Sequence, residues 1–224
     1  MHTQAVEDYL KAIYEVARVE ERVTTNALAE RLGVAPASVT GMVKKLAEMR
    51  LVTHEPYRGV ALSAPGRRIA IEVLRHHRLV ETYLHAALGV PWDEVHDEAE
   101  RWEHVLSEAL EARIDAALGH PTTDPHGAPI PTPALELVEP DWPPLARLET
   151  GQRATVAEVS DHDPHLLRYV GALGLYPGTP FEVTAGAPYA DGPVTVRLLG
   201  GPQAGAEHAV GERAAAHLFV RDIT

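Results

Sequence analysis

The sequence predicts a mainly α-helical protein with a small β domain at its C-terminal end. Apolar residues recur at spacings of three and four through most of the first 118 residues, which is the period of helices with one buried face. A proline-rich segment without a sustained period follows, and beyond residue 148 the pattern changes to short β-like runs separated by Gly and Pro. The 224 residues are enough for one large domain or two modest ones, and we favour two.

The first 62 residues have the pattern of three helices and a hairpin. The helices are expected over Gln4–Val19, from a cap at Thr24 or Thr25 to Gly33, and from Pro36 to about Met49. The hairpin is expected over Leu51–His54 and Gly59–Leu62, joined by the turn residues Glu55–Arg58. Three helices followed by a hairpin make a winged helix-turn-helix.

Two longer helices are expected next, one capped by Ser63 and running to about Leu88, the other from Trp92 or Asp93 to Leu118. Eight prolines between Gly119 and Arg147 indicate a linker. Later runs predict strands over Ala154–Val159, Pro180–Thr184 and Val194–Leu198, with a short helix over Pro164–Leu173. We therefore expect a DNA-binding domain over 1–63, a helical domain over 64–118, a linker over 119–147 and a small β-barrel over 148–224.

Composition excludes several classes of protein. There is no cysteine, so a disulfide framework, an iron-sulfur site and a cysteine nucleophile are excluded, and a metal site must use nitrogen and oxygen. No apolar run approaches the ~20 residues of a membrane span, and the N-terminus lacks the features of a signal peptide, so we expect a cytoplasmic protein. The net charge of -12 hides a basic region, because residues 31–75 hold eight basic and three acidic residues.

The stretch from residue 96 to 104 carries the most informative chemistry. On an unbroken helix, four ligand-type side chains share an arc of about 100°. They are His96, Glu100, Glu103 and His104. The preceding helix adds His77 and Glu81, one turn apart. A solvated acidic face is the alternative, but the histidines fall in register with the carboxylates, which favours a divalent metal ion.

An enzyme is not expected. The order of the Glu and His residues does not give the His-Glu-x-x-His motif of metallopeptidases. A cluster rich in protein ligands also leaves little room for the open water position of a catalytic metal. No separate nucleophile, base and oxyanion donor can be placed around it.

The winged helix-turn-helix together with this cluster resembles the diphtheria toxin repressor family of iron- and manganese-dependent transcriptional regulators. The resemblance covers the whole chain, and Leu173–Thr179 resembles a turn of the SH3-like domain found in longer members and in small ferrous-transport accessory proteins. It implies a cytoplasmic homodimer that represses metal-ion homeostasis genes by binding a double-stranded DNA operator. The alternative is a metal-independent winged-helix regulator that responds to a small organic effector.

The resemblance also implies two metal positions. The activating position maps onto Asp8, Glu100, Glu103 and His104. The ancillary position maps onto His77, Glu81 and His96, completed from the SH3-like domain by Asp161 or, second, Asp163, either of which can instead cap a helix.

Two differences between this chain and related sequences bear on which metal ion binds and on how many ions bind. The iron branch of the family has methionine and cysteine where this chain has Asp8 and Glu100, so Mn2+ is the expected cofactor and Fe2+ the alternative. Manganese-type members often have another acid one turn after Asp8, where this chain has Lys11, which argues against a closely paired binuclear site.

The family's recognition helix maps onto Pro36 to Met49. Ser38 and Thr40 are expected near base edges at its N-terminal end, with Pro36 in its first turn. Lys44 and Lys45 are expected nearer the phosphates, and Arg58 in the wing is expected to make a phosphate or minor-groove contact.

Overall fold

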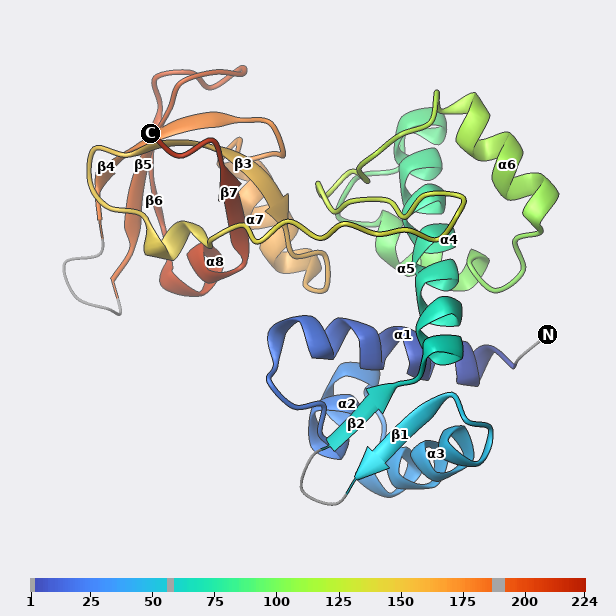
Figure 1. The fold of residues 1–224 in the computed structure, drawn as a ribbon. Helices are drawn as coiled ribbons and strands as arrows, with labels where there is room; N and C mark the ends of the chain where they lie inside the picture. Colours follow the sequence, from blue (N-terminus) through green and yellow to red (C-terminus); the bar gives the residue numbers. More distant parts are fainter. Residues whose placement is uncertain (1–2, 56–58, 187–191) are drawn as a thin grey trace. The chain divides into compact units, whose positions relative to one another are not determined.

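The computed structural model describes residues 3–55, 59–186 and 192–224, and it divides the chain into two compact units (Figure 1). Unit 1 comprises Met1–His77, Trp102–Glu108 and Pro131–Leu137. Unit 2 comprises Arg78–Arg101, Ala109–Ile130 and Val138–Thr224. The chain therefore crosses from one unit to the other several times.

Unit 1 begins with three helices and a hairpin that pack around one core (Figure 1). The elements are α1 (Gln4–Val19), α2 (Thr25–Leu32), α3 (Pro36–Glu48), β1 (Val52–Glu55) and β2 (Gly59–Leu62). Thr24 caps α2 by accepting a hydrogen bond from the Ala27 N–H at 3.1 Å, and Gly33 ends it with φ of 64°. Leu10, Leu28 and other fully buried side chains fill the core. The predicted winged helix-turn-helix is confirmed.

Helix α4 (Ala64–Leu88) has 25 residues, as predicted, and takes part in both units. Ser63 caps it by accepting a hydrogen bond from the Gly66 N–H at 3.2 Å. Gly66 lies against the Leu51 carbonyl, where an added Cβ would collide. No helix in the described ranges combines the length and apolar character that a membrane span needs.

The predicted single helix from Trp92 or Asp93 to Leu118 is wrong. The structure has two helices, α5 (Val95–Trp102) and α6 (Glu108–Ala117), separated by a turn. In an unbroken helix the Glu103 carbonyl would accept a bond from residue 107, whereas here it accepts one from His76 Nδ1 at 3.1 Å. The Glu103 side chain is also bonded to Lys11 and His77. These bonds within unit 1 divert the chain from the helix.

The proline-rich segment contains a folded loop. Thr123 and Pro129 form an isolated β-bridge, and Asp124 Oδ1 accepts hydrogen bonds from the N–H groups of His126 at 2.8 Å and Ala128 at 3.0 Å. His126 and Ile130 are buried. This part of the expected linker therefore packs as an ordered element of unit 2, and a short 3-10 turn, η1 (Leu145–Arg147), follows it.

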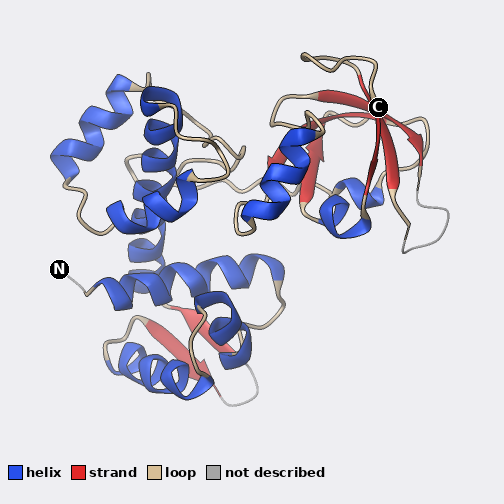
Figure 2. Ribbon diagram, turned by 180° about the vertical axis from the view of Figure 1, so that it is seen from behind, coloured by secondary structure: helices blue, strands red, loops and turns tan. Residues whose placement is uncertain are grey.

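The C-terminal part is a five-stranded antiparallel sheet in the order β6-β5-β4-β3-β7 (Figure 2). The elements are β3 (Arg153–Val159), α7 (Pro164–Ala172), β4 (Pro180–Ala185), β5 (Val194–Leu198), β6 (Glu207–Val210), α8 (Glu212–Ala216) and β7 (Leu218–Arg221). Sequence patterns did not indicate β6, α8 or β7, which have four or five residues each. Trp92, from the connection before α5, joins the core of this sheet.

We expect Gly66→Ala to destabilise unit 1 by about 2 kcal/mol, because the added methyl group would meet the Leu51 carbonyl oxygen, which the Ser63 N–H also holds at 2.9 Å. Gly41→Ala is the matched control, since a Cβ there meets nothing within 4 Å and alanine favours a helix. Thermal unfolding followed by circular dichroism measures both. Equal midpoints for the two variants would show that the contact at Gly66 relaxes freely.

Candidate metal centres

Unit 1 brings together three of the predicted ligands. Asp8, Glu103 and His104 each offer a ligand atom, and these atoms lie within 4.8 Å of one another; we call them the Asp8 cluster. Asp8 comes from the second turn of α1, whereas Glu103 and His104 lie in the turn after α5. The cluster therefore joins two segments that are far apart in the sequence.

His104 is held between two carboxylates. Its Nε2 lies 2.7 Å from Asp8 Oδ1, and its Nδ1 lies 2.8 Å from Glu7 Oε2. Glu7 was not among the predicted ligands, because nothing in its spacing distinguishes it from an ordinary acid in the first turn of a helix. A carboxylate on the far nitrogen of a histidine fixes the ring and makes the other nitrogen a better ligand.

The contact between Asp8 and His104 provides a test of metal fit. Asp8 Oδ1 and His104 Nε2 are both buried, yet they lack hydrogen-bond geometry despite their short separation. In a neutral ring whose Nδ1 donates its proton to Glu7, Nε2 and Oδ1 are two acceptors that face each other, so the pair needs either a proton on Nε2 or a metal ion. A carboxylate oxygen and an imidazole nitrogen suit a divalent metal ion, so these residues fit one.

The protonation of His104 also reflects the need for positive charge at this contact. Burial by itself lowers its pKa, but the adjoining carboxylates of Asp8 and Glu7 and the charge of Glu103 raise the pKa to about 9. The ring is therefore an imidazolium at neutral pH in the absence of metal. A metal ion bound at Nε2 must replace that proton.

Glu103 links the Asp8 cluster to two further side chains. It is 1% exposed and accepts hydrogen bonds from Lys11 Nζ, at 2.7 Å to Oε1 and 2.9 Å to Oε2. Its Oε1 also lies 3.3 Å from His104 Nε2, and its Oε2 contacts His77 Nδ1. The sequence analysis groups His77 with Glu81, but the Nδ1 atom of His77 faces Glu103.

Unit 2 contains a second group, which we call the Glu81 cluster. Its members are Glu81, His96, Asp124, His126 and Asp161. Glu81 is fully buried; its Oε1 lies 3.4 Å from His96 Nδ1, and its Oε2 lies 3.7 Å from His126 Nδ1. His96 Nδ1 lies 3.7 Å from Asp161 Oδ2. The structure therefore brings Glu81, His96 and Asp161 together, as the sequence predicted.

Sequence reasoning missed Asp124 and His126. Ligand-type atoms of Glu81, Asp124 and His126 lie within 4.8 Å of one another, and all three residues are buried. His126 Nε2 donates to the Trp92 carbonyl at 2.7 Å, and its Nδ1 faces Glu81. These residues lie in a proline-rich loop, where no helical or strand period relates one position to another. The sequence feature that could have indicated these ligands is an Asp and a His two residues apart.

Charge is concentrated in the Glu81 cluster. Burial raises the pKa of Asp124 to about 7, helped by the charge of Glu81. Burial alone lowers the pKa of His126, but Glu81 and Asp124 raise it to about 10. Burial also acts to raise the pKa of Asp161, yet His162 and His96 hold it well below its usual range. Neighbouring groups of opposite charge thus stabilise the charged forms of His126 and Asp161, whereas the charged form of Asp124 is destabilised.

Two further predicted ligands, Glu100 and Asp163, make contacts of their own. Glu100 belongs to unit 2, where its Oε1 lies 3.7 Å from His96 Nε2. Asp163 caps α7, since its Oδ1 accepts hydrogen bonds from the N–H groups of His165 at 2.9 Å and Leu166 at 3.4 Å. Of the two acids ahead of α7, Asp161 therefore faces the cluster and Asp163 serves the helix.

The predicted DNA-facing residues of α3 are exposed, namely Pro36, Ser38, Thr40, Lys44 and Lys45. Val39, Val43 and Leu46 form the buried face of the same helix. The Thr40 hydroxyl donates its hydrogen bond to the Pro36 carbonyl oxygen at 3.0 Å. The Thr40 oxygen can therefore accept a hydrogen bond from a group outside the helix but cannot donate one. Arg58 lies outside the described residues.

Known families match all three parts of the chain. Residues 1–60 match the iron dependent repressor N-terminal DNA binding domain, residues 63–132 its metal binding and dimerisation domain, and residues 144–222 the FeoA domain. The diphtheria toxin repressor of Corynebacterium jeikeium is 32% identical over 204 residues, which cover 80% of this chain and 84% of that protein. This chain belongs to the diphtheria toxin repressor family.

Further relatives include both iron and manganese regulators. The iron-dependent repressor IdeR of Mycobacterium tuberculosis is 43% identical over 127 residues, which cover 56% of this chain and 54% of IdeR. A manganese-dependent transcriptional repressor in complex with manganese has a TM-score of 0.89 at 41% identity, covering 96% of this chain and 98% of that one. The manganese regulator SloR has a TM-score of 0.80 at 30% identity, covering 96% and 97%.

Membership of this family establishes a metal-dependent transcriptional repressor with a winged helix-turn-helix and an SH3-like domain. The alternative of a metal-independent regulator with an organic effector is set aside, since the match includes the family's metal-binding domain.

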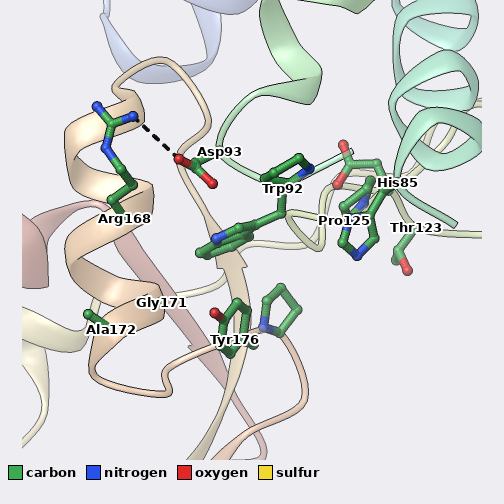
Figure 3. A pocket seen from close by; sticks show the side chains of 12 residues that line it. His85, Trp92, Asp93, Thr123, Pro125, Arg168, Gly171, Ala172 and Tyr176 are labelled. Carbon is green, nitrogen blue, oxygen red and sulfur yellow. Dashed lines mark hydrogen bonds and ion pairs between the residues drawn. The ribbon is translucent and has the colours of Figure 1, made fainter. Parts of the chain in front are cut away.

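The repressor also has a cleft of about 740 Å³ in unit 2 (Figure 3). The rings of Trp92 and Tyr176 lie 4.7 Å apart in its wall, and Arg168 forms an ion pair with Asp93 at 3.4 Å. Asp124 lines the cleft, whereas Glu81 and His126 do not. The cleft therefore borders the Glu81 cluster and does not contain it.

We expect Glu7→Gln to weaken metal binding at the Asp8 cluster by about 10- to 100-fold, because the amide holds the His104 ring less firmly and polarises it less. Glu20→Gln is the control, since it makes the same change in charge at an exposed position just after α1. Calorimetric titration with Mn2+ measures both variants. Equal affinities would mean that Glu7 does not orient the ligand.

Proposed function

We propose that this repressor is activated by Mn2+, with Fe2+ as the alternative, and acts as a cytoplasmic homodimer on operators of metal-ion homeostasis genes. The observation that carries the proposal is the buried pair formed by Asp8 Oδ1 and His104 Nε2, which are 2.7 Å apart without hydrogen-bond geometry. Without metal, the proton of the charged His104 ring faces Asp8, and a metal ion that replaces this proton satisfies both atoms.

The proposed activating ligands are Asp8, Glu103 and His104, with Glu100 retained from the family resemblance. The proposed ancillary ligands extend the predicted set with the loop residues. They are His77, Glu81, His96, Asp161, Asp124 and His126. We propose that Asp163 acts as the cap of α7 rather than as a ligand, because its Oδ1 already accepts two backbone hydrogen bonds.

The donor atoms favour Mn2+. The chain has no cysteine, so its ligands are carboxylate oxygens and imidazole nitrogens. Hard oxygen donors suit Mn2+, whereas soft sulfur favours later transition metals. A solved relative with 41% identity is titled as a manganese-dependent repressor in complex with manganese. Since later metals bind nitrogen and oxygen sites more tightly in general, selectivity for Mn2+ must come from geometry and ligand type.

The residues of the Asp8 cluster connect the DNA-binding helices to the turn after α5. A bound metal ion supplies the positive charge that this arrangement needs. His104 follows Glu7 by 97 residues, so holding His104 against Glu7 and Asp8 fixes α1, and through their shared core α3, to this distant segment. In a two-fold dimer, two α3 helices fixed in this way can enter successive major grooves about 34 Å apart.

We propose that DNA contacts come from residues 1–63 and dimer contacts from residues 64–118, with 119–147 linking them to the SH3-like domain over 148–224. At the N-terminal end of α3, Pro36, Ser38 and Thr40 approach base edges. Lys44, Lys45 and Arg58 contact phosphates.

The first test measures the coupling between metal and DNA. We expect Mn2+ to raise operator affinity at least about tenfold over chelated protein, which corresponds to about 1.4 kcal/mol of coupling. Fluorescence anisotropy is measured on a duplex selected from a random pool, with Mn2+, anaerobic Fe2+, Zn2+ or chelator. His104→Ala should abolish the response, and His126→Ala should weaken it.

His217→Ala is the control for these variants, because His217 is an exposed histidine of the SH3-like domain. Equal operator affinity with and without metal would contradict the proposed mechanism. A full response in the His104→Ala variant would contradict the assigned ligand.

The second test concerns the phosphate contacts. Lys44→Ala and Lys45→Ala should each weaken binding to all sequences and reduce the salt dependence of log K by up to about one unit. Arg153→Ala removes the same charge from an exposed position in the SH3-like domain and should leave the slope unchanged. Should neither lysine variant alter the slope, the DNA surface lies elsewhere.

A further inference from the structure

Helix α3 carries a glycine, Gly41, at a position where the fold does not require one. Gly41 is the sixth of the 13 residues of α3, and glycine in a helix interior is less stable than alanine. Its φ is not positive, and a Cβ added there would meet no atom of the described residues within 4 Å. Neither backbone geometry nor packing therefore explains this glycine.

Gly41 lies at the centre of the exposed face of α3. At 100° per residue, the three buried side chains of the helix lie about 140 to 200° around its axis from Gly41. They are Val39, Val43 and Leu46. The residues one turn before and after Gly41 are exposed, namely Ala37, Ser38, Lys44 and Lys45. The most outward point of α3 therefore carries no side chain.

The surface around Gly41 belongs to the DNA-binding part of the chain. Residues 1–60 match a DNA-binding domain, and α3 is the second helix of the helix-turn-helix that α2 and α3 form. The second helix of this motif lies in the major groove. The side chains of Ser38 and Thr40, which we propose to approach base edges, are short. Short side chains reach base edges only when the helix backbone lies close to them.

We infer that Gly41 sets the depth of α3 in the major groove. This inference rests on the proposed function, because it assumes that α3 enters the groove. With no side chain at the most outward point, the backbone of α3 approaches the base edges closely enough for Ser38 to reach them. A side chain at position 41 would meet the DNA first and hold the helix away. Lys44 and Lys45 would still reach the phosphates, because their side chains are long and flexible.

Gly41→Ala separates DNA binding from folding, because the two expected effects have opposite signs. Alanine favours the helix, so the midpoint of thermal unfolding by circular dichroism should rise or stay the same. In fluorescence anisotropy on full-length protein with Mn2+, affinity for the selected operator should fall at least about tenfold. Affinity for a duplex of unrelated sequence should change less than about twofold, since phosphate contacts dominate there.

Gly41→Leu is the second variant, because leucine also favours the helix and its larger side chain should lower operator affinity at least about 100-fold. Gly211→Ala is the matched control. Gly211 lies in the SH3-like domain with a φ of -60°, and a Cβ there also meets no atom of the described residues within 4 Å. This control should bind the operator as the parent does.

A double-mutant cycle with Ser38 tests the depth of the helix itself. Ser38→Ala should weaken operator binding in the parent but cause no further loss in Gly41→Ala, where the helix no longer reaches the bases. Additive losses would mean that Gly41 acts independently of the base contact, and the inference would be wrong. The same holds if Ser38→Ala has no effect in the parent, since the depth would then serve no contact.

The remaining outcomes separate this inference from the proposed function. Undiminished operator affinity in Gly41→Ala and Gly41→Leu, or equal losses on the operator and the unrelated duplex, would overturn the role of Gly41 alone. If the parent with Mn2+ binds no DNA, or if Lys44→Ala, Lys45→Ala and Ser38→Ala all leave binding unchanged, the proposed DNA surface is wrong and this inference fails with it.

Discussion

The arrangement of unit 1 depends on the neutralisation of one buried carboxylate. Glu103 is 1% exposed, and an unpaired carboxylate at that depth costs on the order of several kcal/mol or takes up a proton. Its partners come from two other helices, Lys11 on α1 and His77 on α4, while His76 holds its backbone carbonyl. These contacts outweigh the gain from continuing α5 by another turn. The same turn exposes His104 to Asp8 and Glu7, so charge neutralisation and the candidate metal centre have one structural origin.

In unit 2, the buried carboxylate that needs neutralisation is Glu81. Glu81 is fully buried, and its two oxygens face His96 on α5 and His126 in the proline-rich loop. The far nitrogen of His126 is bonded to the Trp92 carbonyl, while the Trp92 indole packs among the residues of the SH3-like core (Figure 3). Neutralising one carboxylate thus orders a loop whose sequence has no regular period.

This dependence on distant partners explains which features could be predicted. Helix ends follow local rules, so Thr24, Gly33 and Ser63 mark their boundaries correctly. Asp8, Glu103 and His104 could be chosen as ligands from residue type and family resemblance. Glu7, Asp124 and His126 could not, because their roles depend on tertiary contacts that no spacing encodes. The helix break after Trp102 was hidden for the same reason, since its cause lies in side chains from α1 and α4.

The helix break after Trp102 also changes how the candidate ligands between residues 96 and 104 are divided between the two clusters. On an unbroken helix, the ligand-type side chains of residues 96 to 104 would lie on one face. Instead, His96 faces Glu81 in unit 2, while Glu103 and His104 face Asp8 in unit 1. The chain crosses between the units after His77 and again after Arg101, so each crossing falls between candidate ligands of the two clusters. Because α4 and α5 are continuous through these crossings, only short helical segments of the backbone separate His77 from Glu81 and His96 from Glu103.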